Sequence, residues 1–206
     1  MLTFLPVRLF IAIDIEQSLR QRIAAELPAL RTIAGGARWV RPERMHVTLV
    51  FLGEVDVATV ARVEERARAV AERHPPLVLR ARGGGIFGRP RGPRVLWIGL
   101  EGDVAPLAEV HQDLTRELAP LGFAPEARVF SPHLTLARAR TPRGDPALST
   151  CSAALTGKDW GESRVSELVV YRSDTGREGP RYTAVARLSL GLERVSSRVV
   201  PGSSGN

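Results

Sequence analysis

Two of the four histidines in this chain head the same short pattern, His-x-Thr-Leu. The first copy is His46–Leu49 and the second is His133–Leu136. The side-chain pKa of histidine, about 6.5, lies near neutrality. Two histidines around one substrate can therefore act as a general acid and a general base. A single such histidine is commonly a buried polar residue held by a neighbouring carbonyl, but the matched pair indicates acid–base chemistry.

The threonine two residues after each histidine adds a hydrogen-bond donor. Both motifs lie in apolar runs that predict strands, Met45–Leu52 and Pro132–Ala137. Because alternate side chains of a strand share a face, Thr48 and Thr135 accompany the histidine of their own motif. Two hydroxyls can bind the oxygens of a tetrahedral anion as charge develops on it. This set has no serine or cysteine nucleophile and no carboxylate cluster, so we expect water to be the nucleophile. An in-line displacement at phosphorus, with an acid and a base on opposite sides, suits such a site.

A metal site is the main alternative for the histidines. Zinc normally needs three or four protein ligands, whereas the two motifs supply only His46 and His133. His74 precedes two prolines and His111 falls on a predicted helix, so both are interpreted as surface residues. The single cysteine, Cys151, excludes an internal disulfide and a cysteine cluster, and we expect a small helix residue there. We therefore predict no metal and no cofactor.

The 206 residues are 44% apolar and 25% charged, which is typical of a globular protein, and the formal charge is +7. Residues 1–100 carry 16 arginines against 9 acidic residues. We call residues 73–94 the basic patch, because this stretch contains arginines and no acid. A phosphate-rich partner suits such a patch, and a solvated basic loop is the alternative. The arginines of the patch are Arg73, Arg80, Arg82, Arg89, Arg91 and Arg94.

The apolar N-terminus, Met1–Ile15, lacks the basic start and the small-residue cleavage site of a signal peptide. No run approaches the roughly 18 apolar residues that a membrane-spanning helix needs. We expect a cytoplasmic protein without a membrane partner. Since Leu2–Pro6 adds nothing to the strand that begins near Val7, we also hypothesise that translation starts at Val7.

Strands and helices alternate in two passes along the chain. The first pass predicts strand Arg8–Ile15, helix Gln17–Ile33, the first motif, helix Val57–Arg73 and strand Leu77–Arg82. The second pass predicts strand Arg94–Leu100, a helix over about Val104–Leu121, the second motif, a helical stretch around Asp145–Leu155 and strand Ser166–Tyr171. The matching order and spacing indicate an internal duplication, with repeats at about 8–82 and 94–171.

Two further segments complete the predicted domain. Strand Arg181–Leu190 pairs with the strand before it and closes a single bilobal domain over residues 1–192. Residues 193–206 have no periodicity and are predicted to be a disordered tail. The Gly-Arg stretch Arg82–Arg94 lacks the Gly-Lys-Ser/Thr of a phosphate-binding loop and precedes a strand, so we predict a flexible loop bordering the cleft.

Several segments together resemble the 2H phosphoesterase superfamily, and most closely its RNA 2′,3′-cyclic phosphodiesterases, also called LigT-like or 2′-5′ RNA ligases. They are RLFIAI, HVTLVFLGEV, GIFGRPRGPRVLWIGL, FSPHLTLARAR and LVVYRS with YTAVARLSL. The resemblance covers about residues 8–190. It implies a bilobal α+β fold with two antiparallel sheets about a pseudo-two-fold axis, helices packed outside and the active-site cleft between the lobes.

The resemblance also implies roles for individual residues. His46 corresponds to the proton donor and His133 to the proton acceptor, with Thr48 and Thr135 on the phosphate oxygens. Arg138 corresponds to an arginine that contacts substrate phosphate, and strict alternation places it on the wrong face of its strand, so we expect the backbone to bend there.

The activity implied is metal-independent hydrolysis of a 2′,3′-cyclic phosphate to a 2′-phosphomonoester, by a monomer acting on RNA ends or nucleotides. Two alternatives remain open. The same acid–base pair can run the related 2′-5′ ligation, and a non-catalytic RNA-binding module would use the basic first half of the chain.

Overall fold

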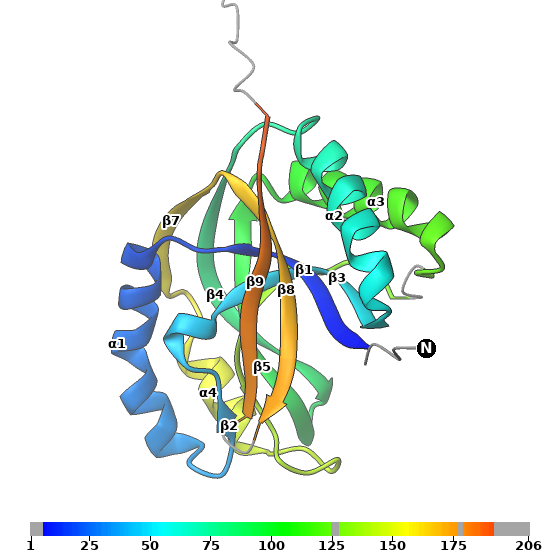
Figure 1. Cartoon of the computed structure of the whole chain (residues 1–206). Coiled ribbons are helices and arrows are strands. Elements are labelled where there is room, and N and C mark those ends of the chain that lie inside the picture. Colours follow the sequence, from blue (N-terminus) through cyan, green and yellow to red (C-terminus); the bar gives the residue numbers. More distant parts are fainter. Residues whose placement is uncertain (1–5, 125–127, 177–178, 192–206) are drawn as a thin grey trace, which may run out of the picture.

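The computed structural model describes residues 6–124, 128–176 and 179–191 (Figure 1). The hypothetical start at Val7 concerns the residues before it, of which only Pro6 is described, and the predicted tail 193–206 lies outside these ranges. The helices are α1 (Gln17–Ile33), α2 (Val57–Ala71), α3 (Val104–Leu118) and α4 (Ala147–Ala154), with short 3₁₀ turns at Pro42–Arg44 and Ala119–Leu121. The strands are β1 (Val7–Asp14), β2 (Arg38–Trp39), β3 (His46–Val55), β4 (Leu77–Arg89), β5 (Gly92–Gly102), β6 (His133–Arg138), β7 (Asp159–Val165), β8 (Glu167–Gly176) and β9 (Gly179–Ser189).

The strands form two antiparallel sheets, which confirms the predicted α+β class. A four-stranded sheet has the order β3-β1-β8-β9, and a five-stranded sheet has the order β2-β6-β5-β4-β7. Strand β8 pairs with β9 as predicted. The sheets do not divide the chain at the boundary between the predicted repeats. The first repeat ends with β4, which lies in the five-stranded sheet, and the second ends with β8, which lies in the four-stranded sheet.

The helices cover the sheets from outside (Figure 1). Helices α2 and α3 pack against each other and against the four-stranded sheet, whereas α1 and α4 pack against the five-stranded sheet. Each helix presents one apolar stripe because apolar residues recur at three- and four-residue intervals. The predicted stripe of α1 is buried as expected, and each such side chain stabilises the fold by about 1.5–3 kcal/mol. This stripe is Leu19, Ile23, Leu27 and Leu30.

The Gly-Arg stretch is not the predicted flexible loop. Strand β4 continues through its glycines to Arg89 and returns as β5 after two residues, so the segment is a β-hairpin. The glycines serve close packing, because a Cβ at Gly85 would overlap the ring of Trp97 and one at Gly84 would lie 2.6 Å from Leu155 Cβ. A larger residue at Gly85 would collide with the tryptophan of the paired strand, so glycine is needed there for packing. The prediction failed because the packing partner is invisible in the local sequence.

Candidate active site

The two sheets approach each other along β3 and β6, the strands that carry the two motifs. His46 is the first residue of β3 and His133 is the first residue of β6. In both strands the histidine and the following threonine are partly exposed, whereas the two residues that alternate with them are buried. The alternation predicted for both motifs is therefore confirmed, and each strand turns its polar pair away from the core.

The two histidine rings are anchored in the same way. His46 Nδ1 lies 2.8 Å from the carbonyl oxygen of Arg44, and His133 Nδ1 lies 2.8 Å from that of Ser131. A carbonyl oxygen can only accept, so Nδ1 must carry the hydrogen in both rings. The neutral form of each imidazole therefore has its lone pair on Nε2. This nitrogen is the atom through which each histidine can exchange a proton with a ligand.

Arg138 lies on the same side of β6 as His133, because the strand contains a β-bulge. Thr135 pairs with Trp97 of β5, and Ala137 pairs with the adjacent Leu96. Two steps along β6 therefore match one step along β5, and Leu136 is the extra residue. Both Leu136 and Ala137 are buried, and Arg138 is exposed. The bulge shifts the alternation by one residue. The predicted bend of the backbone is thus present.

Aromatic rings surround His46 on the face of the four-stranded sheet. Phe10 of β1 has its ring centroid 5.0 Å from that of His46. Tyr182 of β9 meets the histidine ring edge-on, with centroids 5.3 Å apart and an interplanar angle of 87°. Tyr171 of β8 lies further away, at 6.2 Å. These rings restrict the orientation of the imidazole and exclude water from one side of it.

His133 has a comparable aromatic neighbourhood on the five-stranded sheet. Phe87 of β4 meets its ring edge-on, with centroids 4.8 Å apart and an angle of 86°. Trp97 of β5 lies behind, with its centroid 6.4 Å from that of His133. The sequence analysis did not identify these aromatic residues. The aromatic residues of β4 and β5 are visible in the sequence, but interpreting them required the pairing of β5 with both β6 and β4.

Burial lowers the pKa of His46 below 6.5. The hydrogen bond to the Arg44 carbonyl and the charge of Asp14 oppose this shift, and the charges of Arg138 and Arg20 add to it. Burial, with the charge of Arg138, also lowers the pKa of His133, against the hydrogen bond to the Ser131 carbonyl. Since the Arg138 charge acts on both rings, this guanidinium lies within electrostatic reach of both motifs.

Asp14 belongs to a polar network beside His46. The hydroxyl of Tyr171 lies 2.9 Å from both carboxylate oxygens of Asp14, and Arg187 Nη1 lies 3.3 Å from one of them. Burial and the Asp14 carboxylate raise the pKa of Tyr171 to about 12, so its hydroxyl keeps its proton and donates to Asp14. The network holds one carboxylate next to the first histidine.

The other two histidines are partly buried and hydrogen-bonded, so their interpretation as surface residues was wrong. His74 Nε2 lies 3.0 Å from a carboxylate oxygen of Asp113. His111 Nδ1 lies 2.9 Å from the carbonyl oxygen of Leu49, and its ring stacks on Phe130 with centroids 4.1 Å apart. Both act in packing between elements. Across the described ranges, no three His, Cys, Asp or Glu side chains gather as a metal ion would require.

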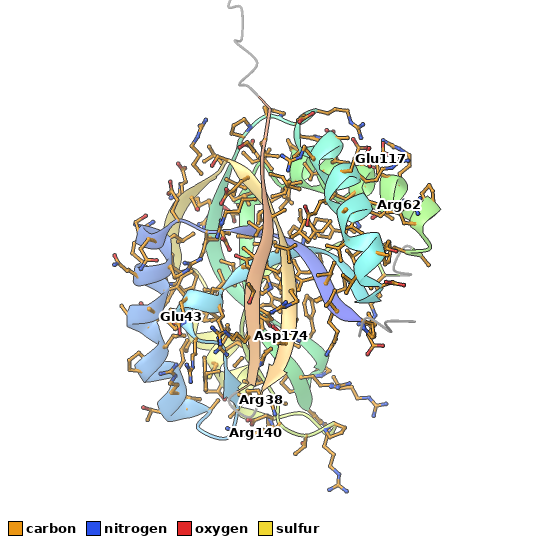
Figure 2. All side chains as sticks on the ribbon, in the orientation of Figure 1. Arg38, Glu43, Arg62, Glu117, Arg140 and Asp174 are labelled. Carbon is orange, nitrogen blue, oxygen red and sulfur yellow. The ribbon has the colours of Figure 1, made fainter. Side chains whose placement is uncertain are left out.

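The basic patch does not form one continuous surface of free charge. Three of its arginines form ion pairs, namely Arg73 with Glu117, Arg80 with Asp159 and Arg82 with Glu101. The other three, Arg89, Arg91 and Arg94, have no ion pair with any described residue. Glu117, the partner of Arg73, lies on α3, at the opposite end of the molecule from Arg38 and Arg140 (Figure 2). Contact between the patch and RNA stays a prediction.

Cys151 is buried in α4, as expected for a small helix residue. None of the helices in the described part of the chain combines the length and apolarity needed to cross a membrane.

Comparison with known proteins matches this arrangement to one family. A family model described as LigT-like phosphoesterase matches residues 13–97 and, a second time, residues 98–182. The RNA 2′,3′-cyclic phosphodiesterase of Methanothermobacter thermautotrophicus is 33% identical, over 86% of this chain and 95% of its own. The crystal structure of TT0787 of Thermus thermophilus superposes with a TM-score of 0.74 at 26% identity, covering 90% of this chain and 99% of the other.

A second solved structure is Escherichia coli LigT complexed with 3′-AMP, with a TM-score of 0.70 and 27% identity. It covers 91% of this chain and 99% of its own. The family model spans both His-x-Thr motifs, and the similarity extends over nearly the whole described chain. Fold, motifs and sequence similarity agree with the resemblance seen in the sequence, and the chain belongs to the LigT-like phosphoesterase family.

Proposed function

We propose that this protein is an RNA 2′,3′-cyclic phosphodiesterase that hydrolyses a terminal 2′,3′-cyclic phosphate to a 2′-phosphomonoester. The matched anchoring of His46 and His133 carries the proposal, because it leaves Nε2 of each ring available for proton exchange. The relative from Methanothermobacter thermautotrophicus bears this activity in its name. The reaction needs one acid and one base around a phosphate, and the two strands supply both.

In this mechanism water attacks phosphorus on the side opposite the 3′-oxygen. His133 Nε2 accepts a proton from the attacking water while His46 Nε2 donates a proton to the departing 3′-oxygen. The new P–O bond forms to water, the P–O3′ bond breaks, and the phosphate stays on the 2′-oxygen. Each histidine contributes a factor of about 10²–10⁴ to the rate. Proton exchange with solvent then restores both rings.

The remaining motif residues stabilise the transition state. Hydroxyls of Thr48 and Thr135 donate hydrogen bonds to the two non-bridging oxygens of phosphorus. Arg138 offers positive charge to the same oxygens, and its influence on the pKa of both histidines supports a position between them. Donors placed in advance around developing charge are effective because they need no reorganisation during the reaction.

The electrostatic difference between the histidines supports the direction of proton transfer. The Asp14 carboxylate favours the protonated form of His46, which suits a proton donor. The charge that acts on His133 is that of Arg138, which favours the neutral form and suits a proton acceptor. Burial lowers the pKa of both rings and the charge of Arg138 acts on both, so the assignment rests on motif order with support from this one carboxylate.

The test is product analysis with a short RNA that ends in a 2′,3′-cyclic phosphate, in the presence of EDTA. We expect a 2′-phosphate as the product, and a loss of about 10² or more in kcat/KM for His46→Ala and for His133→Ala. His74→Gln is the matched control, because this histidine lies at the end of α2 and pairs with Asp113.

Three results would contradict the proposal in different ways. RNA that binds without turnover would indicate an RNA-binding module. Joined RNA ends would indicate a ligase, and activity lost in EDTA and restored by a divalent ion would indicate a metal-dependent mechanism.

We further propose that residues 1–192 form one bilobal domain that acts as a monomer in the cytoplasm. The two interlocked sheets support a single domain. Light scattering of the purified protein and fractionation of native cells would test the monomer and its location.

A further inference from the structure

A pocket of about 310 Å³ opens beside His46 on the face of the four-stranded sheet. Its volume falls at the lower end of the roughly 300–1,000 Å³ of small-ligand sites. The lining comes from β1, β8 and β9, from the first residue of β3 and from the 3₁₀ turn that precedes β3. His133 and the two motif threonines are not part of the lining. The lining residues are Asp14, Glu43, Arg44, His46, Tyr171, Arg181, Tyr182, Ala184 and Arg187.

On the wall of this pocket closest to the sheet, the polar side chains already have hydrogen-bond partners within the protein. Asp14 accepts hydrogen bonds from Tyr171 and Arg187, and Arg187 also pairs with Glu167. Tyr182 presents a partly buried ring that packs on Phe10 with centroids 5.0 Å apart. This side of the pocket therefore combines aromatic surface with polar groups that already have partners within the protein.

The mouth of the pocket carries charged side chains that lack such partners among the described residues. Glu43, Arg44 and Arg181 line it, and none of the three side chains has an ion pair or a side-chain hydrogen bond to another described residue. Glu43 lies on the turn beside α1 (Figure 2). Two guanidinium groups without carboxylate partners make this mouth a site for anions, because arginine binds phosphate oxygens through a fixed fork of donors.

The proton donor fixes which part of the substrate lies here. The acid must face the departing 3′-oxygen, and that oxygen belongs to the ribose, so the nucleoside lies on the side of His46. Water must arrive from the opposite side, next to His133. The pocket that includes His46 is therefore the one open to the nucleoside, and an unstacked base commonly binds against an aromatic side chain.

We propose that this pocket is the subsite for the terminal nucleoside of an RNA strand, and that Arg44 and Arg181 bind the phosphodiester on its 5′ side. The proposal rests on the proposed function and names its substrate class as RNA ends in preference to mononucleotides. Glu43 accepts hydrogen bonds from donors on the base. Tyr182 provides aromatic surface for the nucleoside as well as contact with His46.

The test compares adenosine 2′,3′-cyclic phosphate with the adenylyl dinucleotide that ends in the same cyclic phosphate. The two substrates differ by one 5′ nucleotide and its phosphodiester. We expect Arg44→Gln and Arg181→Gln each to lower the ratio of kcat/KM for dinucleotide over mononucleotide by about tenfold. Each should also reduce the slope of log kcat/KM against log salt concentration, measured with the dinucleotide, because a contact between a guanidinium group and the phosphodiester is lost.

Arg62→Gln is the matched control, because this exposed arginine lies on α2, away from Glu43 and the turn that borders the pocket (Figure 2). It should leave both the ratio and the salt slope unchanged. Ratios unaffected by Arg44→Gln and Arg181→Gln, with both substrates hydrolysed, would overturn the subsite. A wild-type protein that hydrolyses neither substrate would instead overturn the proposed function.

A bulky side chain tests the nucleoside pocket itself. Ala184→Trp fills the pocket, whereas Val78→Trp places the same bulk on β4 of the other sheet, where Val78 is 38% exposed. We expect Ala184→Trp to lower kcat/KM for adenosine 2′,3′-cyclic phosphate at least tenfold more than for ethylene phosphate, a cyclic phosphate without a nucleoside. Equal losses on the two substrates would place the nucleoside elsewhere.

Discussion

The two motif histidines share their backbone anchoring but differ in the charges around them. Both rings are held by a carbonyl two residues earlier, so both expose the same nitrogen. Only His46 has a carboxylate, Asp14, among the groups that raise its pKa. An identical pair of residues thus acquires different electrostatic surroundings from neighbours on other strands, as the proposed division into acid and base requires.

The pKa shifts predict a pH dependence. The productive free enzyme has His46 protonated and His133 neutral, and burial lowers the pKa of both rings below 6.5. The profile of kcat/KM should be bell-shaped with its maximum below pH 6.5. Asp14→Asn removes a group that raises the pKa of His46, so it should move the limb that His46 sets to lower pH and leave the other limb in place. Initial rates over pH 4–9 would measure both limbs. A profile in which neither limb moves would contradict the coupling between Asp14 and His46, and a profile without two limbs would contradict the acid–base pair.

The sequence alone was sufficient to predict the repeated histidines and threonines of the site, but not the aromatic side chains that surround them. The two histidines and two threonines share a local pattern that a strand converts directly into a shared face. Tyr171 and Tyr182 stand more than 120 residues after His46 and reach it only because β8 pairs with β1. The bend before Arg138 was predicted from the conflict between its expected role and strict alternation, and the bulge at Leu136 supplies it.

At the scale of elements, local patterns did not reveal that each predicted repeat places its last strand in the sheet of the other repeat. We call this arrangement strand exchange: β4 lies in the five-stranded sheet and β8 in the four-stranded sheet. Most helices and strands lie within a few residues of their predicted bounds, because their apolar periodicity is strong. Strands β2 and β7 were missed, since one has two residues and the other carries a charged sequence with few apolar positions. The hairpin of β4 and β5 joins the two predicted repeats and holds the end of the first in the sheet of the second.

This exchange predicts that the two sheets unfold together. All three tryptophans, Trp39, Trp97 and Trp160, lie in the five-stranded sheet, whereas both tyrosines, Tyr171 and Tyr182, lie in the four-stranded sheet. Urea unfolding followed by tryptophan fluorescence and by tyrosine absorbance should therefore give coincident midpoints. Two separated transitions would show that each sheet is an independent unit, and would contradict the interlocked arrangement.

At the scale of the whole molecule, two sheets bring together strands from distant parts of the sequence. Each sheet supplies one histidine, one threonine and the aromatic rings around them, and β3 and β6 meet where the sheets approach. The two matches to one family model agree in placement with the predicted internal duplication, which stays a prediction. In the proposed mechanism, two matching strands that each position one imidazole supply both proton-transfer groups of one reaction.

The most direct test of this shared chemistry compares leaving groups. We would measure kcat/KM of the wild type, His46→Ala and His133→Ala with a 2′,3′-cyclic phosphate and with a 4-nitrophenyl phosphodiester, whose nitrophenolate departs without a proton. His46→Ala should lose about 10² or more on the cyclic substrate and far less on the nitrophenyl ester, whereas His133→Ala should lose activity on both. Selective rescue of His133→Ala would reverse the two roles, and equal losses for both variants on both substrates would contradict the division between acid and base.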